Sequence, residues 1–191
     1  MKSGNRRRSL IAVLCCATAL VTPPADAREL SGVTLPESTR VSGTVMRLNG
    51  MGLHKEKVFF KVYVAGLYLE RPTHDPLQAI STDEGKRMVI VMLRDVDRDA
   101  FLEAVEEGIQ RNSGPVMPAL RGRLDRLKQA LPDLEKGNIL DFTYLPGVGT
   151  LVRGQGREMA IAGKDFANAL FSVWLGPNPT DRRLKRKLLG R

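Results

Sequence analysis

The segment Lys57–Leu69 (KVFFKVYVAGLYL) is apolar on both of its alternating faces. Because successive side chains of a β-strand point to opposite sides, this segment would present apolar groups to two sides at once. A strand with two buried faces must lie inside a sheet that other elements cover on each side. The segment therefore predicts a central strand with elements packed on both of its faces.

Shorter strand patterns surround this segment. Val41–Leu48 reads as a first strand, and the dipeptide Asn49-Gly50 that follows it suits a tight turn. The hairpin among the later strands would turn at Leu145–Gly149. Further strands are expected at Arg87–Leu93, Asn138–Tyr144, Thr150–Arg153 and Met159–Ile161.

Between and after these strands, apolar residues recur with helical spacing. The last of these segments is expected to begin after Thr180, a residue suited to capping a helix. Helices are expected around Phe101–Ile109, Met117–Leu131, Phe166–Trp174 and Asp181–Leu189. Strands followed by helices, then strands and helices again, are typical of an α+β domain with an antiparallel sheet.

The first 27 residues have the pattern of a secretory signal. A basic cluster precedes the apolar run Leu10–Val21, which is too short to span a bilayer, and Ala25-Asp26-Ala27 suits a signal peptidase. We therefore expect residues 1–27 to be a signal peptide and residues 28–191 to be one exported domain. The periplasm is its expected location, with secretion as the alternative. The paired arginines before the apolar run leave both the general and the twin-arginine export routes open.

Cleavage after Ala27 changes the chemistry that the chain can perform. Both cysteines leave with the signal, so the remaining domain has none for a disulfide, a nucleophile or a metal site. The net charge falls from +9 to +6, with 26 basic and 20 acidic residues left, which is not the charge of a nucleic-acid-binding tail. The acidic run Asp95–Asp99 imitates a calcium loop, but Ala100 stands where that loop needs glycine. We expect no metal ion and no nucleic-acid partner.

Four segments, in this order, resemble the exported bacterial branch of the chalcone isomerase-like family. They are Leu48–Leu53, Phe59–Leu69, Tyr144–Thr150 and Asp165–Gly190. The resemblance covers roughly residues 31–190. It implies an open-faced β-sandwich, in which a large antiparallel sheet carries helices on one face and a ligand cleft lies between them.

The same resemblance indicates where the plant isomerases hold their catalytic groups, and this chain has lost them. An arginine falls at Met51, one threonine at Tyr63 and another at Val173. A helix tyrosine and asparagine fall at Phe101 and Gly108. We therefore assign no catalytic residue and expect no chalcone isomerase activity.

What the resemblance leaves is an apolar cleft. Met51, Phe101 and Val173 would line a pocket that suits an aliphatic or macrocyclic ligand, and Gly108 belongs to the same set of cleft positions.

In the fatty-acid-binding plastid branch of the family, a tyrosine and an arginine hold the ligand's carboxylate. Tyr63 fits the tyrosine role, since its hydroxyl can donate a hydrogen bond to an anion. Lys61 leaves the same face of the strand. The arginine role has no matching position, and the nearby cationic candidates are Arg47, His54 and Lys55.

Two functions of different class follow. The first is non-catalytic binding of a small apolar anion, with a fatty acid as the expected ligand. The second is an isomerase or intramolecular lyase of unknown substrate that uses Tyr63 as general acid and His54 as acid or base. In a variant of the first, His54 would ligate haem.

The C-terminal segment Asp181–Arg191 is basic and carries three leucines on one side. Such a helix could lie on an anionic membrane surface. Alternatively, the leucines dock on the domain and the cations face solvent. The sequence does not indicate an oligomeric state.

Overall fold

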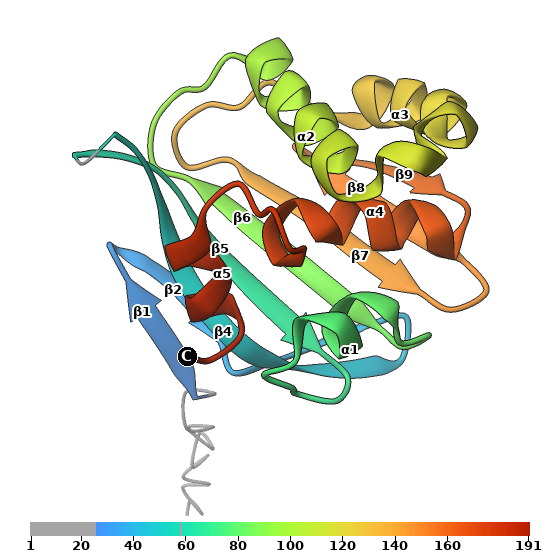
Figure 1. Ribbon diagram of the computed structural model, residues 1–191. Helices are drawn as coiled ribbons and strands as arrows, with labels where there is room; N and C mark the ends of the chain where they lie inside the picture. Colours follow the sequence, from blue (N-terminus) through green and yellow to red (C-terminus); the bar gives the residue numbers. More distant parts are fainter. Residues whose placement is uncertain (1–25, 58) are drawn as a thin grey trace, which may run out of the picture.

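The computed structural model describes residues 26–57 and 59–191 (Figure 1). The expected signal peptide therefore lies almost entirely outside the described residues. The fold is built on a seven-stranded antiparallel sheet in the order β3-β4-β5-β6-β7-β8-β9, so each strand pairs with its neighbour in the sequence. These strands are β3 (Ser38–Val41), β4 (Thr44–Glu56), β5 (Phe60–Leu69), β6 (Lys86–Met92), β7 (Ile139–Leu145), β8 (Gly149–Gly154) and β9 (Arg157–Ile161). A separate hairpin pairs β1 (Ala27–Leu30) with β2 (Val33–Pro36).

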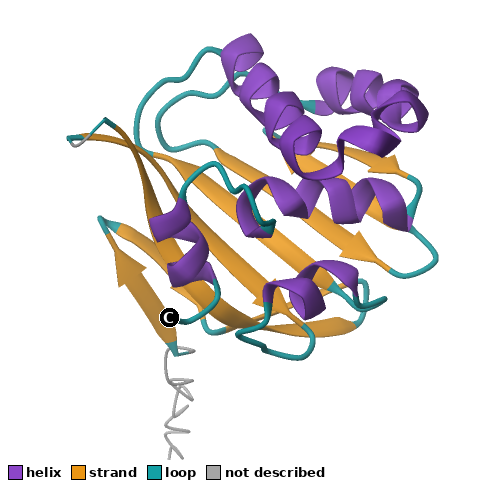
Figure 2. Ribbon diagram, in the orientation of Figure 1, coloured by secondary structure: helices purple, strands orange, loops and turns teal. Residues whose placement is uncertain are grey.

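The helices gather on one face of the large sheet (Figure 2). They are α1 (Pro76–Ser81), α2 (Arg98–Ser113), the 3-10 turn η1 (Gly114–Val116), α3 (Met117–Ala130), α4 (Lys164–Leu175) and α5 (Arg182–Leu188). The prediction of an α+β domain with an antiparallel sheet and helices on one face is confirmed. Among the described residues, none of these helices has both the length and the apolar character needed to span a bilayer.

The sheet has a core on each face. The core on the helix side contains Leu67 and Phe142 from the strands and Phe166 from α4. On the opposite face, β2 covers the sheet, and the Tyr68 hydroxyl donates to the Pro36 carbonyl over 2.9 Å. The prediction that β5 is apolar on both faces and lies inside the sheet is therefore confirmed for most of its length.

The start of the predicted central strand is not buried. Lys57 and Phe59 belong to the turn between β4 and β5, and burial on both faces begins only at Val62. Phe59 and Phe60 are 85% and 56% exposed. The β4–β5 hairpin extends beyond the neighbouring strands, so no other described element covers either face of its tip.

The predicted turn at Asn49-Gly50 is wrong. The chain turns at Ser42-Gly43, where both residues have the positive φ that two-residue hairpin loops favour. The strand β4 then continues through Asn49 and Gly50, with a register shift between Leu48 and Gly50. Such a bulge reverses which side chains face each side of the strand beyond it.

The C-terminal helix α5 packs on β4. Leu184, Leu188 and Leu189 are buried, and the Asn49 side chain donates to the Leu188 carbonyl over 2.8 Å. Of the two alternatives for the C-terminal segment, docking of its leucines on the domain is therefore the correct one. These leucines are not available to a membrane. The residue that caps α5 is Asp181, whereas the sequence had indicated Thr180.

Candidate ligand-binding site

A small cavity lies between β5, α2 and α4, and we call it the inner hollow. Its volume is about 110 Å³. Most of its wall is apolar and consists of Val62, Val96, Ala100, Phe101, Ala104, Val105 and Val173. Its other lining residues are His54, Glu56, Tyr63, Trp174 and Thr180. A few polar groups in an apolar cavity are the usual composition of a site that orients a ligand.

Tyr63 brings a buried polar group to this hollow. Its hydroxyl accepts a hydrogen bond of 3.1 Å from the Trp174 indole nitrogen. Burial raises the pKa of Tyr63 well above the usual range of a phenol, so the hydroxyl keeps its proton at any physiological pH. Within residues 26–57 and 59–191, that proton has no acceptor. The site therefore holds a buried donor that a ligand could use.

His54 lies against Tyr63. The two rings stack with centroids 4.7 Å apart and planes inclined by 29°. The His54 Nδ1 atom is 3.3 Å from the Asp181 Oδ2 atom, while Asp181 Oδ1 accepts backbone N–H groups at the start of α5. Because the carboxylate can only accept, it favours a proton on Nδ1 and leaves Nε2 as the imidazole's second functional atom.

A larger groove adjoins the inner hollow, and we call it the cationic groove. Its volume is about 870 Å³, and it shares His54 and Thr180 with the hollow. Leu30, Met51, Gly52 and Leu53 supply apolar surface, and Asp181 also lines it. Its cations are Lys55, Lys57, Arg182, Arg183 and Lys187. Among the described residues, none of these five cations has an ion pair.

The structure brings four of the proposed site residues together. Tyr63, His54, Phe101 and Val173 all line the inner hollow. The expectation that Met51 lines the same pocket is wrong. Met51 pairs with Gly66 and faces the core on the other side of the sheet, because the bulge at Asn49 reverses the alternation of β4. It lines the cationic groove instead.

Three other proposed residues line neither cavity. Gly108 lies where α2 crosses α4, and a Cβ atom there would come within 2.8 Å of a Val173 methyl group, so this glycine serves helix packing. Lys61 is exposed and pairs across the hairpin with Lys55. Arg47 is exposed near the other end of β4. Of the cationic candidates, only His54 and Lys55 border a cavity.

Trp174 and Asp181 were missed as site residues by sequence reasoning. Trp174 lies 111 residues from the tyrosine that it contacts, and no spacing rule links them. Asp181 lies 127 residues from His54. A stricter capping argument would have placed Asp181 at the start of α5, but its contact with His54 depends on tertiary structure. The acidic run 95–99 has a structural role, since Asp97 caps α2.

Comparison with known proteins is informative at the level of the fold. A family model described as chalcone isomerase-like matches residues 27–190. The crystal structure of a fatty-acid binding protein from Arabidopsis thaliana superposes with a TM-score of 0.68 at 16% identity, covering 86% of this chain and 96% of that chain. No curated protein sequence matches significantly.

Proposed function

The chain belongs to the chalcone isomerase-like family, and on that premise we propose that it binds an apolar anionic ligand, a fatty acid, without transforming it. The observation that carries the proposal is the Tyr63 hydroxyl, which is buried at an apolar cavity and has a proton to donate. A ligand carboxylate could accept a hydrogen bond from this hydroxyl, and a hydrogen bond to a charged group contributes about 1.5–3 kcal/mol.

The surroundings of Tyr63 suit a carboxylate. The phenol supplies a neutral donor, and the imidazole of His54, whose Nδ1 atom contacts Asp181, lies against it. An ionised carboxylate in an apolar cavity must be hydrogen-bonded and paired with a charge; Tyr63 can donate the hydrogen bond, and the adjoining groove carries cations. We therefore place the ligand's head group where Tyr63 and His54 meet.

The inner hollow cannot hold a long acyl chain by itself. Its volume of about 110 Å³ is below the roughly 300–1,000 Å³ of most ligand sites. The cationic groove is large enough and begins at His54. The chain would run over Met51 and Leu53, and the methylene stems of the groove's lysines and arginines could cover it. The resemblance in fold to a fatty-acid binding protein supports this assignment.

The Asp181–His54 pair favours a second candidate function, an isomerase or intramolecular lyase in which His54 moves a proton. However, efficient acid–base catalysis needs pKa values near the working pH, and burial moves the pKa of Tyr63 far above it. A hydroxyl that keeps its proton can hold a ligand but not transfer a proton to it, so the burial of Tyr63 supports binding over catalysis. The inner hollow, at about 110 Å³, has no room for a haem macrocycle.

Trp174, the chain's one tryptophan, lines the hollow and can report on binding. We expect its fluorescence to change saturably when a saturated fatty acid is titrated into the protein. Tyr63→Phe should weaken the affinity about tenfold or more, because it removes a hydrogen bond to a charged group. Tyr68→Phe is the matched control, since Tyr68 lies on the other face of β5. Equal affinities for the three proteins would remove Tyr63 from the site.

The length of the ligand should matter through the cationic groove. Each methylene that is buried contributes about 0.8 kcal/mol, so the dissociation constant should fall about fourfold per added carbon until the groove is filled. Competition titrations with saturated fatty acids of increasing length would measure this. Affinities that do not depend on length would show that the chain lies outside the groove.

We also propose that the protein acts in the periplasm. The support is the signal pattern of residues 1–27, which ends where the family match begins. Intact mass spectrometry of the protein isolated from the periplasm should give a chain that starts at Arg28. A chain that keeps Met1 and fractionates with the cytoplasm would contradict this.

A further inference from the structure

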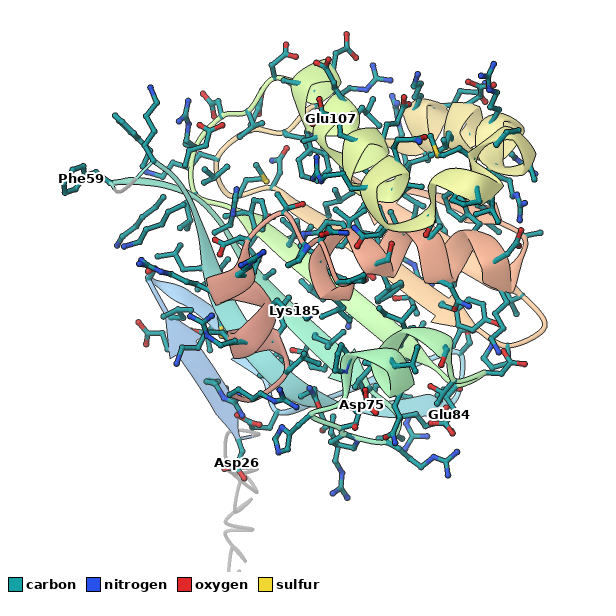
Figure 3. All side chains as sticks on the ribbon, viewed as in Figure 1. Asp26, Phe59, Asp75, Glu84, Glu107 and Lys185 are labelled. Carbon is teal, nitrogen blue, oxygen red and sulfur yellow. The ribbon has the colours of Figure 1, made fainter. Side chains whose placement is uncertain are left out.

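The tip of the β4–β5 hairpin carries two neighbouring exposed aromatic residues. Phe59 is 85% exposed and Phe60 is 56% exposed. Figure 3 shows Phe59 extending from the tip, away from the rest of the domain. Single exposed apolar residues are common on protein surfaces, but an adjacent aromatic pair on a projecting loop indicates an interaction site.

Cations surround this tip. Lys55, Lys57 and Lys61 belong to the same hairpin and are exposed. The one acidic residue of segment 55–61 is Glu56. Its carboxylate lies 3.7 Å from the Arg94 guanidinium, which offsets its negative charge. Across the cationic groove, α5 adds further positive charge through Arg182, Arg183 and Lys187.

We propose that this end of the molecule docks on an anionic lipid bilayer. Phe59 and Phe60 would bury their rings at the boundary between the head groups and the acyl chains. The lysines of the hairpin and the cations of α5 would contact the negatively charged head groups. Apolar insertion and electrostatic attraction together are what stable peripheral binding requires.

The charge argues against a second copy of this chain as the partner. Two tips brought together would each carry Lys55, Lys57 and Lys61, and like charges placed opposite one another oppose association. A projecting apolar tip within a ring of cations is instead complementary to a surface that is apolar inside and anionic outside. The leucines of α5 take no part, because they are buried against the domain.

Docking in this orientation would bring the ligand site close to the lipid. Lys55 and Lys57 line the cationic groove, and Glu56 and Val62 line the inner hollow. A bound acyl chain could then exchange with the bilayer without crossing water. This consequence rests on the proposed function, whereas the docking itself does not.

Sedimentation with lipid vesicles tests the proposal. The natural protein should bind vesicles of phosphatidylcholine and phosphatidylglycerol far better than vesicles of phosphatidylcholine alone. Phe59→Ser/Phe60→Ser should weaken binding to the anionic vesicles on the order of 100-fold, because two apolar rings lose their burial. Lys55→Gln/Lys57→Gln/Lys61→Gln should cause a loss on the order of 100-fold as well. The natural protein and all variants have the same N-terminal residues, so any effect of residues before the domain on vesicle binding is the same in each.

The control is Leu77→Ser/Val148→Ser, which removes two apolar residues that are also exposed but lie in α1 and in the β7–β8 turn. This variant should bind vesicles like the natural protein. In solution, the phenylalanine variant should keep its affinity for fatty acid, since neither ring lines a cavity, so the two proposals can fail separately.

Three results would overturn the docking proposal. The first is a natural protein that does not bind the anionic vesicles. The second is a phenylalanine variant that binds them as well as the natural protein. The third is a dimer, seen by analytical ultracentrifugation, that the phenylalanine variant abolishes while vesicle binding persists, which would assign the tip to self-association.

Discussion

Replacing Gly50 with alanine should lower the free energy of unfolding by about 3 kcal/mol. A Cβ atom at this position would overlap the carbonyl oxygens of Lys187 and Leu188, which are backbone atoms and cannot rotate away. The overlap is relieved only if α5 moves off β4, and this movement would expose Leu184 and Leu188. For a domain of this size, the melting temperature should fall by roughly 6–12 °C.

The same substitution at Gly122 is the matched control. Gly122 is exposed on α3, and a Cβ atom there would have no neighbour within 4 Å. Because alanine favours the helix over glycine, Gly122→Ala should raise the free energy of unfolding by about 0.5–1 kcal/mol. Urea denaturation would measure both changes in the free energy of unfolding, which should be opposite in sign. A Gly50→Ala variant as stable as the natural protein would show that α5 does not pack on β4 as described.

Lys86 should make the protein more stable as the pH rises from 8 to 10. Its side chain is buried, and Nζ donates to the carbonyls of Ile80 and Thr82 at the end of α1. Burial lowers the pKa of Lys86 to about 8, and the charge of Lys164 adds to this effect. The ordinary value, which the unfolded chain keeps, is 10.5.

The direction of this change in stability follows from the number of protons that the folded and unfolded states bind. Between pH 8 and 10.5 the unfolded chain holds more protons than the folded one, so unfolding becomes less favourable as the pH rises. The gain over this window should reach about 2–3 kcal/mol. Above pH 10 the tyrosines act in the opposite direction, because burial raises the pKa values of Tyr68 and Tyr144 to about 12 and the unfolded chain ionises first.

Urea denaturation of the natural protein and Lys86→Met across this range isolates the lysine. The stability difference between the two proteins should move in favour of the natural protein as the pH rises towards 10. Two curves that stay parallel would show that Lys86 titrates normally in the folded state.

The parts of the fold that local patterns determine could be predicted. The alternation in β5 and the glycine-rich turn between β7 and β8 depend on neighbouring residues, and the structure has both, with β5 beginning three residues later than predicted. Asn49-Gly50 favours a turn locally, but α5 docks against it from the far end of the chain. The turn preference of two adjacent residues carries no information about a contact with a helix more than 100 residues away in the sequence.

The candidate site was predicted in part for the same reason. The resemblance to a family placed Tyr63 and Phe101 in a cleft, and both line the hollow. Met51 was misplaced because a single bulge reverses the faces of β4, and bulges leave little trace in an apolar pattern. The exposure of Phe59 and Phe60 was missed because an apolar alternation does not show how far a hairpin extends beyond its neighbours.

The most direct test of the account is the nuclear magnetic resonance spectrum of a fatty acid labelled with carbon-13 at its carboxyl group. If the cleft binds the acid by its carboxylate, a bound carboxyl resonance distinct from the free one will appear. Its chemical shift should change in Tyr63→Phe and in His54→Gln but not in Tyr68→Phe. A single resonance at the position of the free acid, or a bound resonance that neither site variant moves, would contradict the claim that this cleft holds an apolar anion by its head group.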